Sequence, residues 1–148
     1  FGSLVDHNKK KPIMLISNII TLITFILGFL IYIFAPADAF KSITSPYLWS
    51  LITLVFAGVI VGNIRGIAFP TLITIMVDEE NRDKANGLYG TINGISFLIA
   101  SLASGFFIAN SGLYWIVLGS IILLVLAIIH LFFVEIPENK IVKTEGHD

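Results

Sequence analysis

The class of this protein follows from residues 2–35, which read GSLVDHNKKKPIMLISNIITLITFILGFLIYIFA. A short polar loop ends in Lys9, Lys10 and Lys11, and the uncharged apolar segment Ile13–Ala35, 23 residues long, follows almost at once. Roughly 20 apolar helical residues are enough to cross the hydrocarbon core of a bilayer. The stretch therefore predicts a membrane-spanning helix that begins at a positively charged surface.

The composition of the whole chain agrees with a lipid environment. Of its 148 residues, 56% are apolar and 13% are charged, whereas soluble domains contain about 25% charged residues. The chain has no cysteine and its three histidines lie far apart in sequence, so we expect no metal site and no cofactor. The absence of a basic face argues against a nucleic-acid partner.

Three further apolar segments are long enough to cross the bilayer. With the first, the predicted spans are Ile13–Ala35, Leu48–Val77, Ala85–Ala109 and Leu113–Val134. Transmembrane strands are disfavoured because these runs do not alternate apolar and polar residues. The short connections make successive spans antiparallel. The predicted fold class is all-α, a polytopic membrane protein with four transmembrane helices and a tail at residues 135–148.

Two of the connections carry signals for the start of a helix. Ser45 followed by Pro46 predicts the N-cap and first position of the second span. Asp83 predicts the N-cap of the third span.

The orientation follows from the basic residues. With four spans, both ends of the chain lie on one side, and that side carries Lys9, Lys10, Lys11, Arg82, Lys84, Lys140 and Lys143. The loop on the other side carries only Lys41. Because cytoplasmic loops are enriched in lysine and arginine, we expect both ends to be cytoplasmic. We expect the location to be a bacterial plasma (inner) membrane.

Arg65 is the most unusual residue of the second span. It lies about 12 residues from the predicted cytoplasmic end, or ~18 Å along a helix. Ionisable groups at such depth usually face a bundle interior or an aqueous cavity. The residue pattern leaves open the binding of a substrate anion, proton coupling, a gating ion pair and a structural hydrogen bond to backbone carbonyls. Arg65 is therefore the leading candidate for a substrate or coupling-ion cavity.

Asn63 and Asn93 are the other cavity candidates. Asn63 lies about 200° around the helix from Arg65. We therefore expect Asn63 and Arg65 to belong to different sites. Asn93 is the weaker candidate, because a carboxamide that joins two membrane helices is a common structural feature.

Small residues predict which helices pack closely. Repeats of the GxxxG type occur in the second and third spans at Gly58, Gly62, Gly66, Gly90 and Gly94. A stripe of small and hydroxyl residues follows one face of the first span: Ser17, Thr21, Thr24 and Gly28. The fourth span is apolar nearly all round. We expect the second and third spans to be central and the first and fourth to be peripheral, as in a piece of a larger bundle.

Two motifs resemble those of the major facilitator superfamily. Residues 2–11 resemble its cytoplasmic loop motif, G-x-L-a-D-r-x-G-r-[RK], and the matching positions are Gly2, Leu4, Asp6, Lys10 and Lys11. His7 and Lys9 depart from the motif. Residues 82–88 read RDKANGL, similar to the R-x-x-A-N-G-L that follows the fourth helix in efflux-type members. The resemblance implies that the chain is part of the N-terminal six-helix half of a twelve-helix transporter, with its spans as helices 3–6; helices 9–12 are the alternative.

The resemblance also implies a function. It predicts a secondary active transporter, not an enzyme, that moves small molecules by alternating access as an efflux-type permease. Its partners would be the lipid bilayer, the remaining helices of the transporter and a small-molecule substrate. A proton is a further candidate partner, as the coupling ion. The family pattern places a cytoplasmic gating motif at Gly2, Asp6, Lys10, Asp78 and Arg82. Within it, Asp6, Lys10 and Asp78 would form a charge latch that holds the outward-open state.

A self-contained four-helix oligomeric membrane protein, either a small multidrug carrier or a membrane scaffold, is the alternative function. Small carriers of that kind use an acidic residue within a span, and no span here contains Asp or Glu. The fifth-helix antiporter motif of the family has a proline that the corresponding residues 100–105 lack. Symport, antiport and uniport therefore stay open.

Overall fold

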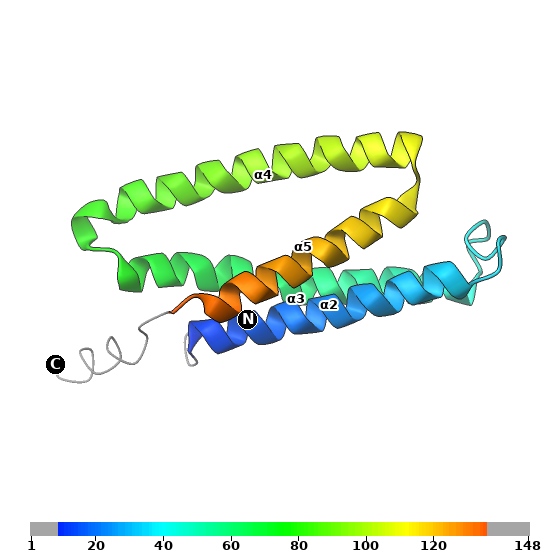
Figure 1. Ribbon diagram of the computed structural model, residues 1–148, viewed down its shortest axis with the longest axis horizontal. Helices are drawn as coiled ribbons and strands as arrows, with labels where there is room; N and C mark the ends of the chain where they lie inside the picture. Colours follow the sequence, from blue (N-terminus) through cyan, green and yellow to red (C-terminus); the bar gives the residue numbers. More distant parts are fainter. Residues whose placement is uncertain (1–8, 136–148) are drawn as a thin grey trace.

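The structure is a computed structural model that describes residues 9–135. Its elements are α2 (Lys10–Phe34), α3 (Pro46–Met76), the short 3₁₀ helix η1 (Glu79–Asn81), α4 (Arg82–Asn110) and α5 (Leu113–Phe133). All four α-helices are long and apolar enough to cross a membrane (Figure 1). The predicted fold class, an all-α polytopic membrane protein, is confirmed.

The helix boundaries differ from the predicted spans by a few residues. Ser45 is the N-cap of α3 and Pro46 lies in its first turn, as predicted. The predicted N-cap of the third span is wrong, because α4 has Asn81 as its N-cap and Asp83 lies in its first turn. The 3₁₀ turn η1 leads directly into α4 and starts that helix earlier. Asp83 still places a negative charge near the positive end of the helix dipole.

Successive helices run in opposite directions. The start of α2, the junction between α3 and α4 and the end of α5 lie at one end of the molecule (Figure 1). The reversal from α4 to α5 takes only residues 111–112. Gly112 adopts a φ of +81°, a left-handed conformation that glycine adopts without steric cost. This tight turn holds the ends of α4 and α5 together.

The seam between α2 and α3 is the most closely packed part of the structure. Thr21 Oγ1 donates a hydrogen bond to the carbonyl of Gly58, at 3.1 Å. A Cβ atom added at Gly58 would lie 2.5 Å from Thr24 Oγ1, so only glycine fits there without a shift. Ser17 and Thr21 are 2% and 5% exposed. The predicted packing stripe of the first span is confirmed, and it faces α3.

The seam contains no unpaired hydroxyl. Ser17 donates to the carbonyl of Met14, Thr21 to that of Ser17 and Thr24 to that of Thr21. Such bonds are needed in lipid, where no water is present to satisfy polar groups. Beyond the hydroxyl stripe, the seam continues as an apolar cluster of Met14, Ile64, Ala68 and Leu72.

α5 packs along α2 and is tied to it at one end. Lys11 Nζ donates to the carbonyl of Phe132, at 3.2 Å, and to that of Val134. These carbonyls end α5 and have no partner within the helix. The ammonium group also lies at the negative end of the helix dipole. Near the opposite end, the rings of Phe29 and Tyr114 lie 5.2 Å apart.

α4 lies apart from the other helices over much of its length (Figure 1). None of its residues is buried, whereas α2 has six buried residues. Within residues 9–135, therefore, the first span is enclosed and the third is not. The expected ranking of central and peripheral helices concerns a larger bundle and stays a prediction. The hydroxyl stripe of α2 meets α3, while the small residues of α4 have no helix of the described chain against them.

The glycines of the GxxxG repeats differ in their surroundings. A Cβ atom added at Gly62 would lie 3.8 Å from Thr21 Oγ1. Added at Gly66, Gly90 or Gly94, it would meet nothing within 4 Å. A packing role for these last three residues stays a prediction.

We predict that Gly58→Ala destabilises the protein more than Gly66→Ala, in the same helix. The added methyl group at Gly58 forces apart Thr24 and the α3 backbone, which costs about 1–3 kcal/mol. At Gly66 the methyl group meets no atom, and alanine favours the helix by about 0.5–1 kcal/mol. Thermal unfolding of the purified variants in detergent measures both effects. Equal midpoints for the two variants would contradict the close approach at Gly58.

Candidate functional site

The site centres on Arg65, in the middle of α3. Arg65 lies 11 residues before the end of that helix at Met76, which corresponds to ~17 Å. Its Nη1 donates a hydrogen bond to Oδ1 of Asn18 on α2, at 3.0 Å. Asn18 is only 2% exposed. The seam between α2 and α3 thus brings a buried carboxamide to the guanidinium group.

Asn18 is a site residue that the sequence reasoning missed. It follows Ser17 on the buried side of α2, but the predicted packing stripe of the first span did not include it. The available signal was its type: it is the only carboxamide in α2. Polar side chains in membrane helices hydrogen-bond to polar partners on neighbouring helices, and Arg65 on the antiparallel α3 is such a partner.

Arg65 has no carboxylate partner among the described residues. Apart from Asp83 in the first turn of α4, the four α-helices contain no Asp or Glu; Glu79 and Glu80 lie in η1, at the end of the spans. Within residues 9–135, Asn18 is the one hydrogen-bond partner of the guanidinium group. A neutral carboxamide satisfies one N–H but leaves the positive charge uncompensated. The site therefore attracts a negative charge from outside these helices.

Arg65 lines two hollows of the size of ligand pockets. The larger hollow has a volume of about 750 Å³. Its polar lining residues come from all four helices: Thr21, Asn63, Arg65, Ser96 and Ser120. Its other side is apolar, with Leu123 and Ala127 of α5. The larger hollow thus combines one charge, several hydroxyl groups and an apolar wall.

The smaller hollow, of about 370 Å³, lies between α3 and α4. It is lined by Gly62, Asn63, Arg65, Gly66, Phe69, Tyr89 and Asn93. Asn63 and Arg65 line both hollows, so the expectation that they do not share a site is wrong. Residues about 200° apart on α3 can line one hollow because the hollow is wide enough to extend around more than one face of the helix.

Asn93 and an aromatic pair complete the smaller hollow. Asn93 lies 11 residues after the start of α4, ~17 Å along the helix, which is the same depth as Arg65. The rings of Phe69 and Tyr89 stack at 4.8 Å with an interplanar angle of 20°. This stack joins α3 to α4 at one end of the hollow, about one helical turn from Arg65.

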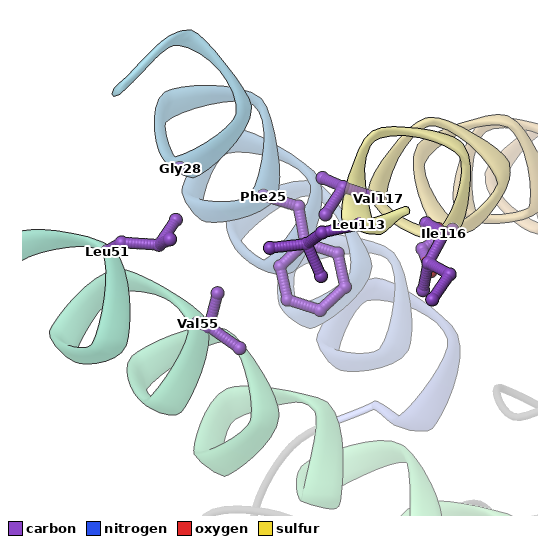
Figure 2. A pocket seen from close by; sticks show the side chains of 8 residues that line it. Phe25, Gly28, Leu51, Val55, Leu113, Ile116 and Val117 are labelled. Carbon is purple, nitrogen blue, oxygen red and sulfur yellow. The ribbon is translucent and has the colours of Figure 1, made fainter. Parts of the chain in front are cut away.

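A third pocket has a different character. It has a volume of about 200 Å³ and lies between α2, α3 and α5. Figure 2 shows Leu51 and Val55 reaching from α3 towards Gly28 and Phe25 on α2. Its only polar lining residue is Ser120. The hydroxyl of Ser120 donates to the carbonyl of Ile116, at 2.9 Å, and the other lining side chains are apolar.

The predicted gating motif is described only in part. Gly2 and Asp6 lie outside the described residues. Lys10 is 7% exposed at the beginning of α2. Asp78 is exposed and is the N-cap of η1, and Arg82 Nε donates to the carbonyl of Val77, at 3.1 Å. The charge latch between Asp6, Lys10 and Asp78 stays a prediction.

We predict that Asn18→Leu destabilises the protein by about 1–3 kcal/mol, because it leaves the guanidinium N–H of Arg65 without its partner. The double variant Asn18→Leu with Arg65→Leu should recover most of this loss, since replacing both partners by apolar groups can be nearly neutral. Thermal unfolding of the wild type, both single variants and the double variant measures the coupling. Strictly additive effects would contradict the hydrogen bond between Asn18 and Arg65.

Comparison with known proteins identifies the family. The sequence profile described as Major Facilitator Superfamily matches residues 1–147. Searches among curated proteins and among solved structures gave no match. The profile match covers nearly the whole chain, and the four apolar helices agree with it. The chain therefore belongs to the Major Facilitator Superfamily and is an integral, multi-pass membrane transporter.

Proposed function

We propose that the chain supplies the third to sixth helices of a twelve-helix secondary transporter that moves a small molecule by alternating access. The observation that carries this proposal is Arg65, which Asn18 holds at 3.0 Å beside two hollows in the middle of the spans. A charge in mid-membrane is costly and is usually retained for a substrate or ion pathway. The position of Arg65 suits a role in such a pathway, because this residue lines both hollows.

The exposure of α4 supports the placement of the chain in a larger bundle. This helix carries Ser96, Asn93 and small residues along its length, yet none of its residues is buried. Small and polar residues on a membrane helix mark contacts with other helices. We infer that helices of the remaining transporter lie against α4 and close the two hollows. A self-contained four-helix protein is the weaker alternative, because the family match favours a transporter bundle.

The direction of transport is proposed from one motif. The sequence RDKANGL at the start of α4 resembles that of efflux-type members. It covers residues 82–88, where η1 leads into the helix. We therefore propose that the protein exports the small molecule. The coupling ion stays open, and a proton is one candidate.

We propose that both ends of this segment face the cytoplasm. Lys9 is the N-cap of α2, Lys11 lies in its first turn and Arg82 is the first residue of α4. The beginnings of α2 and α4 lie at the same end of the molecule (Figure 1). The opposite end carries the indole of Trp49, whose Nε1 donates to the carbonyl of Ile43, at 2.7 Å. Lysine and arginine mark the cytoplasmic side, and tryptophan and tyrosine mark membrane interfaces.

Cysteine labelling tests this orientation, since the chain contains no cysteine of its own. Ser42→Cys, in the loop between α2 and α3, should react with a membrane-impermeant maleimide in intact cells. Glu80→Cys, in η1, should react only after the membrane is permeabilised. The reverse pattern would invert the proposed topology.

Arg65→Ala tests the proposed function. Cells that overproduce the full-length protein are first screened for export of a panel of labelled metabolites, which identifies a cargo. Arg65→Ala should then lower its export rate by at least about tenfold, as expected for the loss of one charge-assisted contact. Lys41→Ala, which removes a charge from an exposed loop, should export normally, and the amount of each variant in the membrane is measured by immunoblotting. Full export by Arg65→Ala at equal membrane levels would remove Arg65 from the mechanism.

A further inference from the structure

We propose that the smaller hollow takes an organic anion that carries an aromatic ring, with the anionic group on Arg65 and the ring against Phe69 and Tyr89. This inference rests on the proposed function, because it names the class of molecule that the transporter would carry. The smaller hollow contains both an uncompensated guanidinium group and a stacked aromatic pair.

The anionic part follows from the charges. Asn18 occupies one guanidinium nitrogen of Arg65, at 3.0 Å, from the α2 side. Arginine has five N–H donors in a planar fork, which suits two oxygens of a carboxylate. Arg65 lines the smaller hollow, and within residues 9–135 the bond to Asn18 is the one hydrogen bond of its guanidinium group. Since the described spans hold no Asp or Glu beside it, an anionic ligand would supply the missing negative charge.

The carboxamides extend this polar region. Asn63 and Asn93 line the same hollow from α3 and α4. Each carboxamide offers two N–H donors and one acceptor oxygen. Together with Arg65 they form a donor-rich group at one depth in the membrane. Such a group favours a carboxylate over a cationic or apolar molecule.

The aromatic part follows from the ring pair. Phe69 lies four residues after Arg65 on α3, which corresponds to ~6 Å along the helix. A ligand with a carboxylate at one end and a fused ring system at the other can therefore contact both residues. Phe69 is 42% exposed although it stacks on Tyr89. Its remaining surface can therefore accept a third ring in an offset or edge-on contact.

The stacked rings of Phe69 and Tyr89 in the smaller hollow disfavour small inorganic anions as ligands. Phosphate or chloride would satisfy Arg65 but leave the ring pair without a partner. A ligand with both a carboxylate and a ring satisfies both parts of the hollow. The volume of about 370 Å³ is sufficient for a molecule of this size.

Equilibrium binding to the purified full-length protein in nanodiscs tests the proposal with three probes: 2-naphthoate, its neutral analogue 2-naphthamide, and acetate. We expect saturable binding of 2-naphthoate about tenfold tighter than that of 2-naphthamide, because only the anion pairs with Arg65. Acetate, which lacks the ring, should bind more weakly than 2-naphthoate. Equal binding of 2-naphthoate and 2-naphthamide, or no saturable binding of 2-naphthoate, would overturn the proposal without the need for any variant.

Two variants then locate the site. Arg65→Gln should abolish the preference for 2-naphthoate over 2-naphthamide, whereas Lys41→Gln, in the loop after α2, should keep it. Tyr89→Leu should weaken 2-naphthoate about threefold to tenfold and leave acetate unchanged. Its matched control is Phe106→Leu, on the same helix with a 63% exposed ring outside both hollows. An anion preference that survives Arg65→Gln would place the anion elsewhere and overturn the assignment.

The outcome is separable from that of the transport experiment. If Arg65→Ala abolishes export but the wild type shows no preference for 2-naphthoate, the aromatic anion is wrong and the transporter function stands. In that case a carboxylate from another helix of the transporter would be the partner of Arg65. If 2-naphthoate is preferred but Arg65→Ala still exports its cargo, the binding site stands and its role in transport fails.

Discussion

A guanidinium group in the middle of a bilayer constrains everything around it. Charged groups at this depth are expensive unless they meet polar partners, and in this structure the partner is Asn18 on the neighbouring helix. For Asn18 to reach Arg65, α2 and α3 must lie close together at this depth. Gly58 and the hydroxyl stripe of α2 allow this approach. The packing of the seam and the presence of the charge therefore depend on each other.

Most of the fold could be predicted from the sequence, because it depends on local properties. Long uncharged runs define the four helices, and Ser45 with Pro46 defines the beginning of α3. Asp83 was assigned as an N-cap wrongly, since a 3₁₀ turn before a helix leaves little trace in composition. Which helices are central in a larger bundle stays a prediction. The small residues of α4 indicate that it has neighbours, but they do not say whether those neighbours belong to residues 9–135.

Only part of the site could be predicted from the sequence, because residue types are local but contacts between helices are not. Arg65, Asn63 and Asn93 stand out as polar residues in apolar spans, and all three line the smaller hollow. Asn18 did not stand out, because its role depends on the register between two helices, which no local pattern encodes. The same holds for the stack of Phe69 on Tyr89, whose members come from different helices. Residue types can reveal candidates, whereas only the packing of helices shows which candidates meet.

The two-residue connection at Gly112 limits how this cavity can change shape. From Asn110 to Leu113 the chain covers three peptide units, which at full extension reach only about 10 Å. The ends of α4 and α5 at this turn must therefore stay adjacent in every conformation of the protein. Sliding α4 bodily away from α5 is ruled out. α4 can therefore widen or narrow the hollows beside Arg65 by tilting or bowing about this tether, and its part in access to the charge is set by an angle.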